Sequence, residues 1–127
     1  MVKNHGKAHA SSSVNPFNGH LYLLISPKTF SAANVFAVTF KDNGLATLIG
    51  EPTGNQPSCY GDIFVFKMPH SGFQFTVSYK HFSRPDQRLT HETPLEPDIY
   101  VPTTRQDIIG GRDAQMEKLM EIITAAK

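Results

Sequence analysis

Ser31 is the residue of this sequence best placed to act as a nucleophile. It follows a short apolar run at 21–25 and precedes A-A-N-V-F-A, whose apolar residues have helical spacing. A serine between a strand and a helix presents its hydroxyl at the edge of a sheet, beside the free backbone N–H groups of the helix start. The structural alternative is a helix N-cap, for which serine is among the commonest residues. Both interpretations place Ser31 at the beginning of a helix.

Three elements must position Ser31, and their spacing predicts a β-α-β unit. The apolar run H-L-Y-L-L-I at 20–25 is typical of a strand buried on both faces. A helix is predicted over 31–43, ending before Gly44, and A-T-L-I-G at 46–50 returns as a strand. The apolar positions of this helix recur at three- and four-residue spacing: Ala33, Phe36, Ala37 and Phe40. A strand, a helix and a strand within about 30 residues indicate parallel strands joined by a crossover helix.

The second half of the chain has a different pattern. Strands are predicted at 62–69 and 73–82, joined by the turn sequence H-S-G. Because side chains alternate strictly in the second strand, we expect a hairpin with one wet face. Its apolar face carries Phe73, Phe75, Val77 and Tyr79. A loop is expected over 83–97, followed by a short strand at 99–101.

The two ends of the chain are predicted to differ. Asp113 is the expected N-cap of an amphipathic helix, whose apolar face we interpret as core packing. That face carries Met116, Leu119, Met120 and Ile123. Residues 1–19 are rich in Gly, Ser, Asn and Pro and predict a flexible lead-in. The folded domain is therefore expected over 20–127.

Composition restricts the function classes. The chain has 127 residues, 39% hydrophobic and 18% charged, which is ordinary for one globular domain and predicts no membrane segment. Twelve Lys and Arg residues against eleven Asp and Glu leave a net charge of +1, which disfavours nucleic acid as a partner. The single cysteine, Cys59, has no second cysteine to pair with, and no Cys/His spacing indicates a metal. No cofactor is expected.

Several segments together resemble the C-terminal processing (tail-specific) peptidases, a family of serine proteases that includes the tricorn branch. They are T-F-S-A-A-N at 29–34, D-N-G-L-A-T-L-I-G-E-P-T-G at 42–54, the predicted hairpin, and L-E-P-D-I-Y-V at 95–101. The resemblance covers about 20–123. It implies an α/β fold with a ClpP/crotonase-like core, of which this chain would be the C-terminal half, and it implies serine peptidase activity.

The resemblance also implies site residues. Ser31 would form the acyl-enzyme, and the backbone N–H of Ala32 would belong to the oxyanion hole. Gly54 and Asn55 are expected to shape the substrate cleft, or else to form a tight turn. Gln56 is expected to hydrogen-bond a substrate backbone or to shape the same loop.

The general base is where this sequence departs from the family pattern. Processing peptidases use a lysine that aligns with Gln56, whose amide cannot accept the serine proton at neutral pH. The tricorn branch uses a histidine from an upstream segment and a glutamate downstream of the serine, for which Glu92 and Glu96 are candidates. His91 is the histidine of this chain that we consider as a local base.

We therefore predict a serine peptidase that cleaves peptide or protein substrates. The isolated chain is expected to be inactive, with the base supplied by an N-terminal remainder of the same protein. A non-catalytic ligand- or peptide-binding module on the same fold stays open as the alternative. A histidine and a Gly-rich strand upstream would favour the peptidase.

Overall fold

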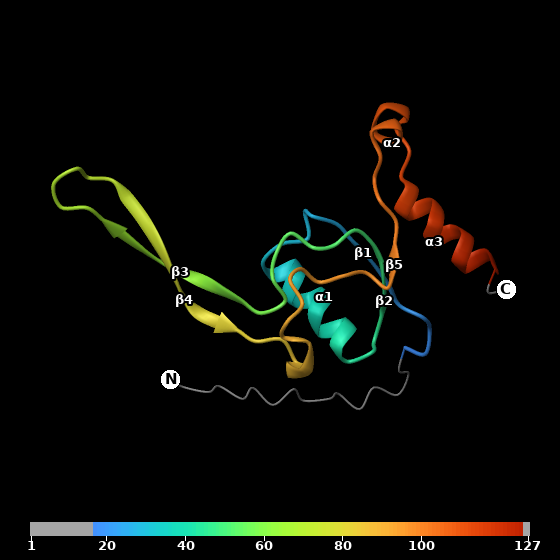
Figure 1. Cartoon of the computed structure of the whole chain (residues 1–127), viewed down its shortest axis with the longest axis horizontal. Helices are drawn as coiled ribbons and strands as arrows, with labels where there is room; N and C mark the ends of the chain where they lie inside the picture. Colours follow the sequence, from blue (N-terminus) through green and yellow to red (C-terminus); the bar gives the residue numbers. More distant parts are fainter. Residues whose placement is uncertain (1–16, 126–127) are drawn as a thin grey trace.

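The computed structural model describes residues 17–125. In this part of the chain a small sheet and one helix form the centre, a long hairpin projects at one end, and the C-terminal helices lie at the other (Figure 1). Most of the lead-in expected at 1–19 lies outside the described residues, so its flexibility stays a prediction.

The predicted β-α-β unit is present at the centre of the fold. Strand β1 spans Tyr22–Ile25, helix α1 spans Ala32–Asp42, and strand β2 spans Thr47–Gly50. The two strands pair in parallel along their full length. The expectation of parallel strands joined by a crossover helix is confirmed, with boundaries shifted by one or two residues.

A third parallel strand, β5 (Ile99–Tyr100), pairs with the other edge of β2, so the sheet order is β1-β2-β5. Asp98 aligns this strand with β2. Its backbone N–H donates to Leu48 O at 2.8 Å, and its carboxylate accepts the Leu48 N–H at 2.8 Å. Residues that are distant in sequence are thereby joined into one sheet.

The hydrophobic core lies between α1 and this sheet. Ala37 and Val38 of the helix are 2% and 1% exposed, and they pack in one cluster with Ile25, Leu48 and Leu95. Leu95 comes from the segment before β5, which runs across the helix (Figure 1). Burial of these side chains from water is the main force that fixes the orientation of α1 on the sheet.

The buried face of α1 differs from the one that its apolar spacing predicts. The residues that face the core are Asn34, Ala37 and Val38. Phe36 is 51% exposed, and its ring contacts that of Phe40 in a tilted arrangement, with centroids 4.3 Å apart. The helix is apolar on more than one side, so periodicity alone did not identify which side meets the sheet.

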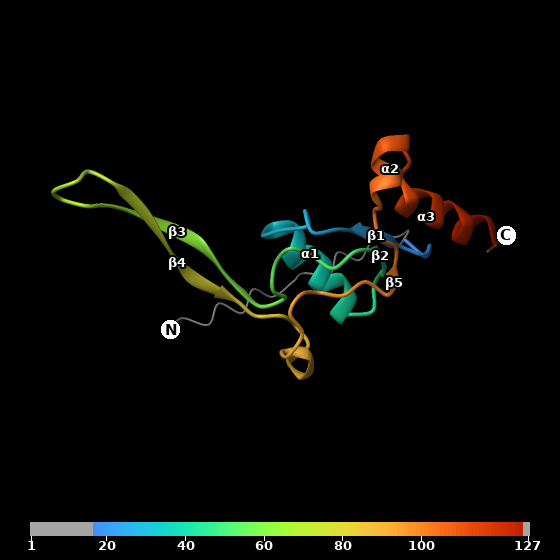
Figure 2. The same cartoon turned by 45° about the horizontal axis from the view of Figure 1, so that its top comes forward.

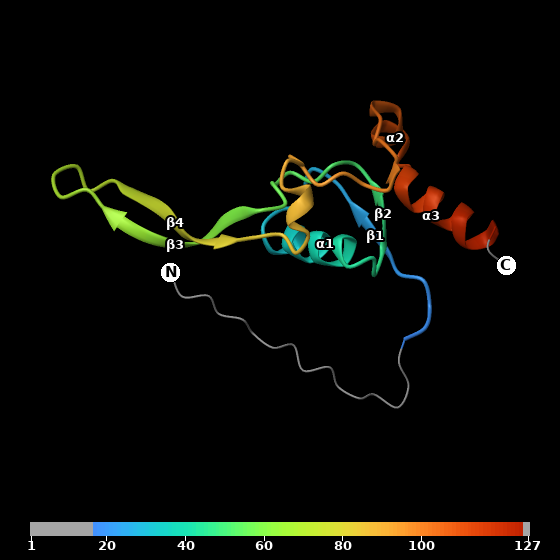
Figure 3. The ribbon, with the colours of Figure 1, turned by 60° about the horizontal axis from the view of Figure 1, so that its bottom comes forward.

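The hairpin consists of β3 (Cys59–Lys67) and β4 (Gln74–Phe82) in antiparallel register. Its base adjoins the start of α1, and the remainder stands clear of the rest of the described chain (Figure 2 and Figure 3). The predicted alternation is present, and the aromatic residues of one face stack on one another, with Phe64 and Tyr79 4.2 Å apart. Both faces are nevertheless exposed within residues 17–125.

The C-terminal segment contains a 3-10 turn, η1 (Gln87–Leu89), and two helices, α2 (Arg105–Gly110) and α3 (Ala114–Ala125). Asp113 accepts the Met116 N–H at 2.9 Å, as expected of the N-cap of α3. Helix α3 contacts β1 and β2. It buries no residue fully in the described part of the chain, so its interpretation as core packing was wrong here.

No helix among residues 17–125 combines the length and apolar character needed to cross a membrane.

Candidate active site

Ser31 directly precedes α1 and has an unusual backbone conformation. Its φ is 54° and its ψ is −122°. A positive φ is uncommon for a residue with a Cβ, and such strain persists only where the surrounding structure enforces it. The Ser31 side chain is exposed and makes no capping hydrogen bond to the helix. Ser31 occupies the N-cap position, but its hydroxyl does not do the work of a cap.

The first backbone donors of α1 are only partly used. The Ala33 N–H donates to Phe30 O at 3.2 Å, and the Val35 N–H donates to Ser31 O at 3.0 Å. The Ala32 N–H has no hydrogen-bond partner among residues 17–125. This donor lies beside the Ser31 hydroxyl at the positive end of the helix dipole, where a developing negative charge is stabilised.

The loop after β2 closes over the start of α1. The Ser31 N–H donates to Asn55 Oδ1 at 3.0 Å, and the Gly54 N–H donates to Thr29 O at 3.2 Å. A Cβ at Gly54 would lie only 2.1 Å from Pro27 O, so glycine is required for this close approach. Glycine at position 54 therefore allows this loop to lie directly against the segment that precedes α1.

Gln56 contributes its backbone rather than its side chain to this arrangement. Its carbonyl oxygen accepts Nδ2 of Asn34 at 2.9 Å. Asn34 is fully buried on α1, and its Oδ1 has no hydrogen-bond partner within the described part of the chain. The loop is thus held to the helix at two points, one on each side of Ala32.

A cavity of about 300 Å³ opens beside Ser31. Its walls come from the start of α1, the loop after β2 and the base of the hairpin. The lining residues are Phe30, Ser31, Ala32, Val35, Asn55, Cys59, Tyr60, Gly61, Asp62 and Phe82. Of the three loop residues expected to bind substrate, Asn55 lines the cavity, whereas Gly54 and Gln56 do not.

The charge balance of the cavity is nearly neutral. Asp62 is its one carboxylate, and it pairs with Lys80 at 3.1 Å. Among residues 17–125, no lysine or histidine lines the cavity. His81 comes near it, since its ring lies 4.8 Å from the Tyr60 ring, but its Nδ1 pairs with the Ser83 hydroxyl at 3.1 Å.

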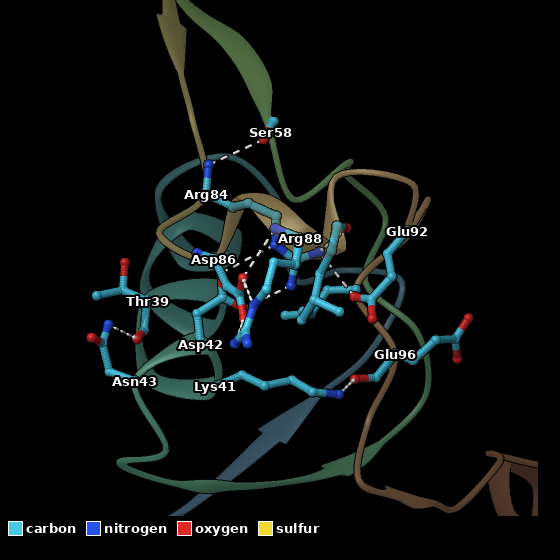
Figure 4. Close-up of polar contacts among 12 residues, drawn as sticks. Thr39, Lys41, Asp42, Asn43, Ser58, Arg84, Asp86, Arg88, Glu92 and Glu96 are labelled. Atoms are coloured by element: carbon cyan, nitrogen blue, oxygen red, sulfur yellow. Dashed lines mark hydrogen bonds and ion pairs between the residues drawn. The ribbon is translucent and has the colours of Figure 1, made fainter.

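Glu92 lies at the other end of α1. Its carboxylate pairs with Arg84 at 3.0 Å, and Arg84 also pairs with Asp42 at 2.7 Å (Figure 4). Asp42 is the last residue of the helix, about 16 Å along the axis from Ser31 at 1.5 Å per residue. The structure therefore does not bring Glu92 to Ser31, because the carboxylate is held by a buried arginine.

Glu96 is also remote from Ser31. Its carbonyl oxygen accepts Lys41 Nζ at 2.6 Å, which places it beside the C-terminal turn of α1 (Figure 4). Its side chain is not part of the cavity. Neither of the two glutamates considered as partners of a catalytic histidine lies near Ser31 in the described chain.

Arg84, Asp42 and Glu92 form a cluster of ion pairs, the Arg84 cluster, which stabilises the fold. The side chains of Arg84 and Asp42 are 0% exposed. Burial alone would raise the pKa of Asp42, but hydrogen bonds from Arg84 and from the Asp86 N–H outweigh it and hold that pKa below its ordinary 3.8. The hydrogen bond with Asp42 in turn raises the pKa of Arg84. Both groups are therefore charged at neutral pH.

Sequence reasoning did not identify the hairpin residues of the cavity. No functional role was predicted for Cys59, and Asp62, whose φ is 47°, was not singled out. The signal available in the sequence was position alone, since the strand that begins at Cys59 follows the loop that contacts Ser31. Within residues 17–125 no group of three or more His, Cys, Asp or Glu side chains is placed to hold a metal ion.

Known structures share this arrangement of elements. The chain is similar to the tricorn protease, with a TM-score of 0.63 and 19% identity, over 83% of this chain and 10% of that one. It is similar to a putative peptidase from Parabacteroides merdae, with a TM-score of 0.60 and 25% identity, over 84% of this chain and 32% of that one. It is also similar to mature CPAF, with a TM-score of 0.50 and 25% identity, over 68% of this chain and 16% of that one.

The chain thus spans a third or less of each of these structures. No curated protein matches the sequence. The pattern that defines peptidase family S41 matches residues 2–101, which is most of the chain and includes Ser31, the loop after β2 and the hairpin. The chain therefore belongs to peptidase family S41.

Proposed function

We propose that this chain carries the nucleophile of a serine peptidase, and that Ser31 forms the acyl-enzyme. One observation carries the proposal: Ser31 is held at φ 54° with its hydroxyl free, next to an Ala32 N–H that has no partner in the described chain. At most helix starts the N-cap side chain and the first N–H groups are hydrogen-bonded. A serine hydroxyl and an N–H group that both stay open are expected where they bind a ligand.

The chemistry follows from this geometry. The Ser31 Oγ attacks the carbonyl carbon of the scissile peptide, while its proton passes to a general base. The resulting oxyanion accepts a hydrogen bond from the Ala32 N–H and is stabilised by the helix dipole. Collapse of the tetrahedral intermediate expels the amine, which takes a proton, and leaves an ester on Ser31. Water then hydrolyses the ester and restores the serine.

The base is proposed to come from a part of the peptidase that residues 17–125 do not include. The residues that line the cavity include no histidine or lysine, and the one carboxylate is paired with Lys80. Glu92 and Glu96 lie at the far end of α1. We therefore expect the 127-residue chain alone to hydrolyse no peptide above background.

The cavity supports a finer proposal about the substrate. Phe30, Val35 and Phe82 make much of its wall apolar, and Lys80 neutralises Asp62. A charged side chain would lose its hydration here without gaining an unpaired partner. An uncharged, apolar side chain of the substrate therefore suits the cavity beside Ser31.

The test is acylation by a fluorophosphonate probe, applied to a complete peptidase that contains this chain. We expect labelling that Ser31→Ala abolishes and that Ser71→Ala, in the exposed hairpin turn, leaves unchanged. Labelling that survives Ser31→Ala would refute the proposal. Peptides that differ only in one apolar or charged residue next to the scissile bond test the preference of the cavity.

A non-catalytic binding module is the second candidate. It is favoured by the absence of a base among the cavity residues, because an apolar cavity of about 300 Å³ can hold a ligand without any chemistry. Saturable binding of an apolar ligand by both wild type and Ser31→Ala, with no hydrolysis by either, would support this candidate.

A further inference from the structure

The strained conformation of Ser31 needs a restraint, and the structure supplies one from a side chain. The Ser31 N–H donates to Asn55 Oδ1 at 3.0 Å. The orientation of the Asn55 amide follows from chemistry, since a backbone N–H must meet the oxygen and not the nitrogen of the side chain. A serine released from this contact would be free to return to a negative φ, as at an ordinary N-cap.

Asn55 is itself anchored to the core. Its carbonyl oxygen accepts the Thr53 hydroxyl at 3.0 Å. Thr53 is 4% exposed and exchanges two contacts with Leu95: its N–H donates to Leu95 O at 3.1 Å, and its Oγ1 accepts the Leu95 N–H at 3.3 Å. Leu95 is fully buried in the cluster beneath α1. The position of Asn55 is therefore coupled to the hydrophobic core.

Two more hydrogen bonds keep the loop in register with the nucleophile. The Gly54 N–H reaches Thr29 O, and Asn34 Nδ2 reaches Gln56 O at 2.9 Å. These contacts fix the backbone on both sides of Asn55. The side-chain contact to Ser31 is the one among the three that acts on the nucleophile itself.

We propose that Asn55 is a positioning residue: its Oδ1 holds the Ser31 N–H, and this keeps Ser31 at positive φ with the Ala32 N–H free for the oxyanion. The inference rests on the proposed peptidase function for its catalytic consequence. The restraint itself can be tested without any activity.

The first test measures hydrogen exchange of the Ser31 amide by NMR in the full chain. In Asn55→Leu, which keeps the side-chain shape but has no acceptor, we expect exchange about tenfold faster, as for the loss of one hydrogen bond. Asn55→Asp keeps an acceptor oxygen and should retain protection. Asn43→Leu is the matched control, because Asn43 contacts Thr39 O at the opposite end of α1.

Unchanged exchange at Ser31 in Asn55→Leu would overturn the restraint. If Asn55→Leu does not fold, Asn55→Asp decides the question. A carboxylate acceptor strengthens the hydrogen bond and moves the Ser31 amide proton downfield. An amide proton that does not move in Asn55→Asp would also overturn it.

The second test measures kinetics in the complete peptidase. Asn55→Leu should lower kcat by about 10²-fold, comparable to the loss of an oxyanion donor, and leave KM within about threefold. A purely structural role would instead lower the fraction of folded enzyme, and kcat per labelled Ser31 would not change. That result would overturn the catalytic role.

The two proposals fail in different ways. If wild-type Ser31 is not acylated at all, the proposed peptidase function is wrong, and so is the catalytic role of Asn55. The exchange experiment still decides whether Asn55 restrains Ser31. If Ser31 is acylated equally fast in wild type and Asn55→Leu, the peptidase function stands and this inference is wrong.

Discussion

The two ends of helix α1 treat polar groups in opposite ways. At the N-terminal end the Ser31 hydroxyl and the Ala32 N–H have no partners in the described chain, and the backbone is strained. At the C-terminal end Arg84 donates to Asp42, Glu92 and a backbone carbonyl, and its side chain is 0% exposed. Under the proposed function the open groups at the N-terminal end would receive a substrate, whereas the satisfied groups at the C-terminal end stabilise the fold.

The largest expected effect on activity comes from a substitution at the N-terminal end of α1. Ser31→Ala should abolish acylation, a loss on the order of 10⁶-fold in kcat. The melting temperature should stay close to that of wild type, because the hydroxyl has no partner to lose. Probe labelling and a thermal melt measure the two quantities. A large drop in melting temperature would mean that Ser31 is a structural cap.

A substitution at the C-terminal end of α1 should instead change stability. Arg84→Ala leaves Asp42 buried without its partner and should lower the free energy of unfolding by about 3–5 kcal/mol. Arg88→Ala is the matched control, because the Arg88 side chain is 88% exposed and its pairing with Asp86 is screened by water. Urea denaturation measures both variants. Equal effects of the two would contradict the contrast drawn between buried and exposed pairs.

A smaller effect is expected in the loop that closes over the N-terminal end of α1. Gln56→Ala should lower kcat by at most about 10²–10³-fold, because the backbone oxygen that holds Asn34 is retained. The comparison with Ser31→Ala in the complete peptidase is the measurement. Loss of all activity in Gln56→Ala would mean that the side chain takes part in the chemistry and that the alignment of this loop is wrong.

Acidification should gradually remove the stabilisation that Asp42 contributes to the Arg84 cluster. The pKa of Asp42 lies below 3.8 in the folded state, so its stabilisation is present above that value and is lost as pH falls through the folded pKa. The slope contributed by one such group is at most about 1.4 kcal/mol per pH unit. Unfolding free energies measured from pH 5 downward should fall less steeply in Asp42→Asn. An unchanged slope would assign the acid sensitivity to other carboxylates.

The sequence predicted the local elements well because local rules decide them. The strand before Ser31, the helix after it and the alternation in β4 follow from apolar spacing, and the Asp113 cap follows from a short-range hydrogen bond. Helix α2 was missed, although Thr104 and Asp107 form a capping box, because it lies in a short segment without an apolar repeat.

The sequence could not predict which apolar face is covered. The helix α1 and the hairpin both have apolar residues on more than one side, and burial depends on what packs against them. Phe36 on α1, Phe64 on β3 and Met120 on α3 are each about half exposed. Periodicity indicates that a face is apolar, but only the tertiary arrangement decides whether another element lies on it.

Ser31 was readable from the sequence as a candidate site residue, because it stands in the contiguous segment T-F-S-A-A-N between an apolar strand and an apolar helix. The surroundings of the candidate residues were decided by contacts between distant segments. Asn55 reaches Ser31 across 24 residues, and Arg84 holds Asp42 across 42 residues and also binds Glu92. The sequence determined that Ser31 begins a helix; tertiary packing decided its strained backbone, its open donor and the removal of Glu92 from its surroundings, because hydrogen bonds over such separations form only when the whole core is assembled.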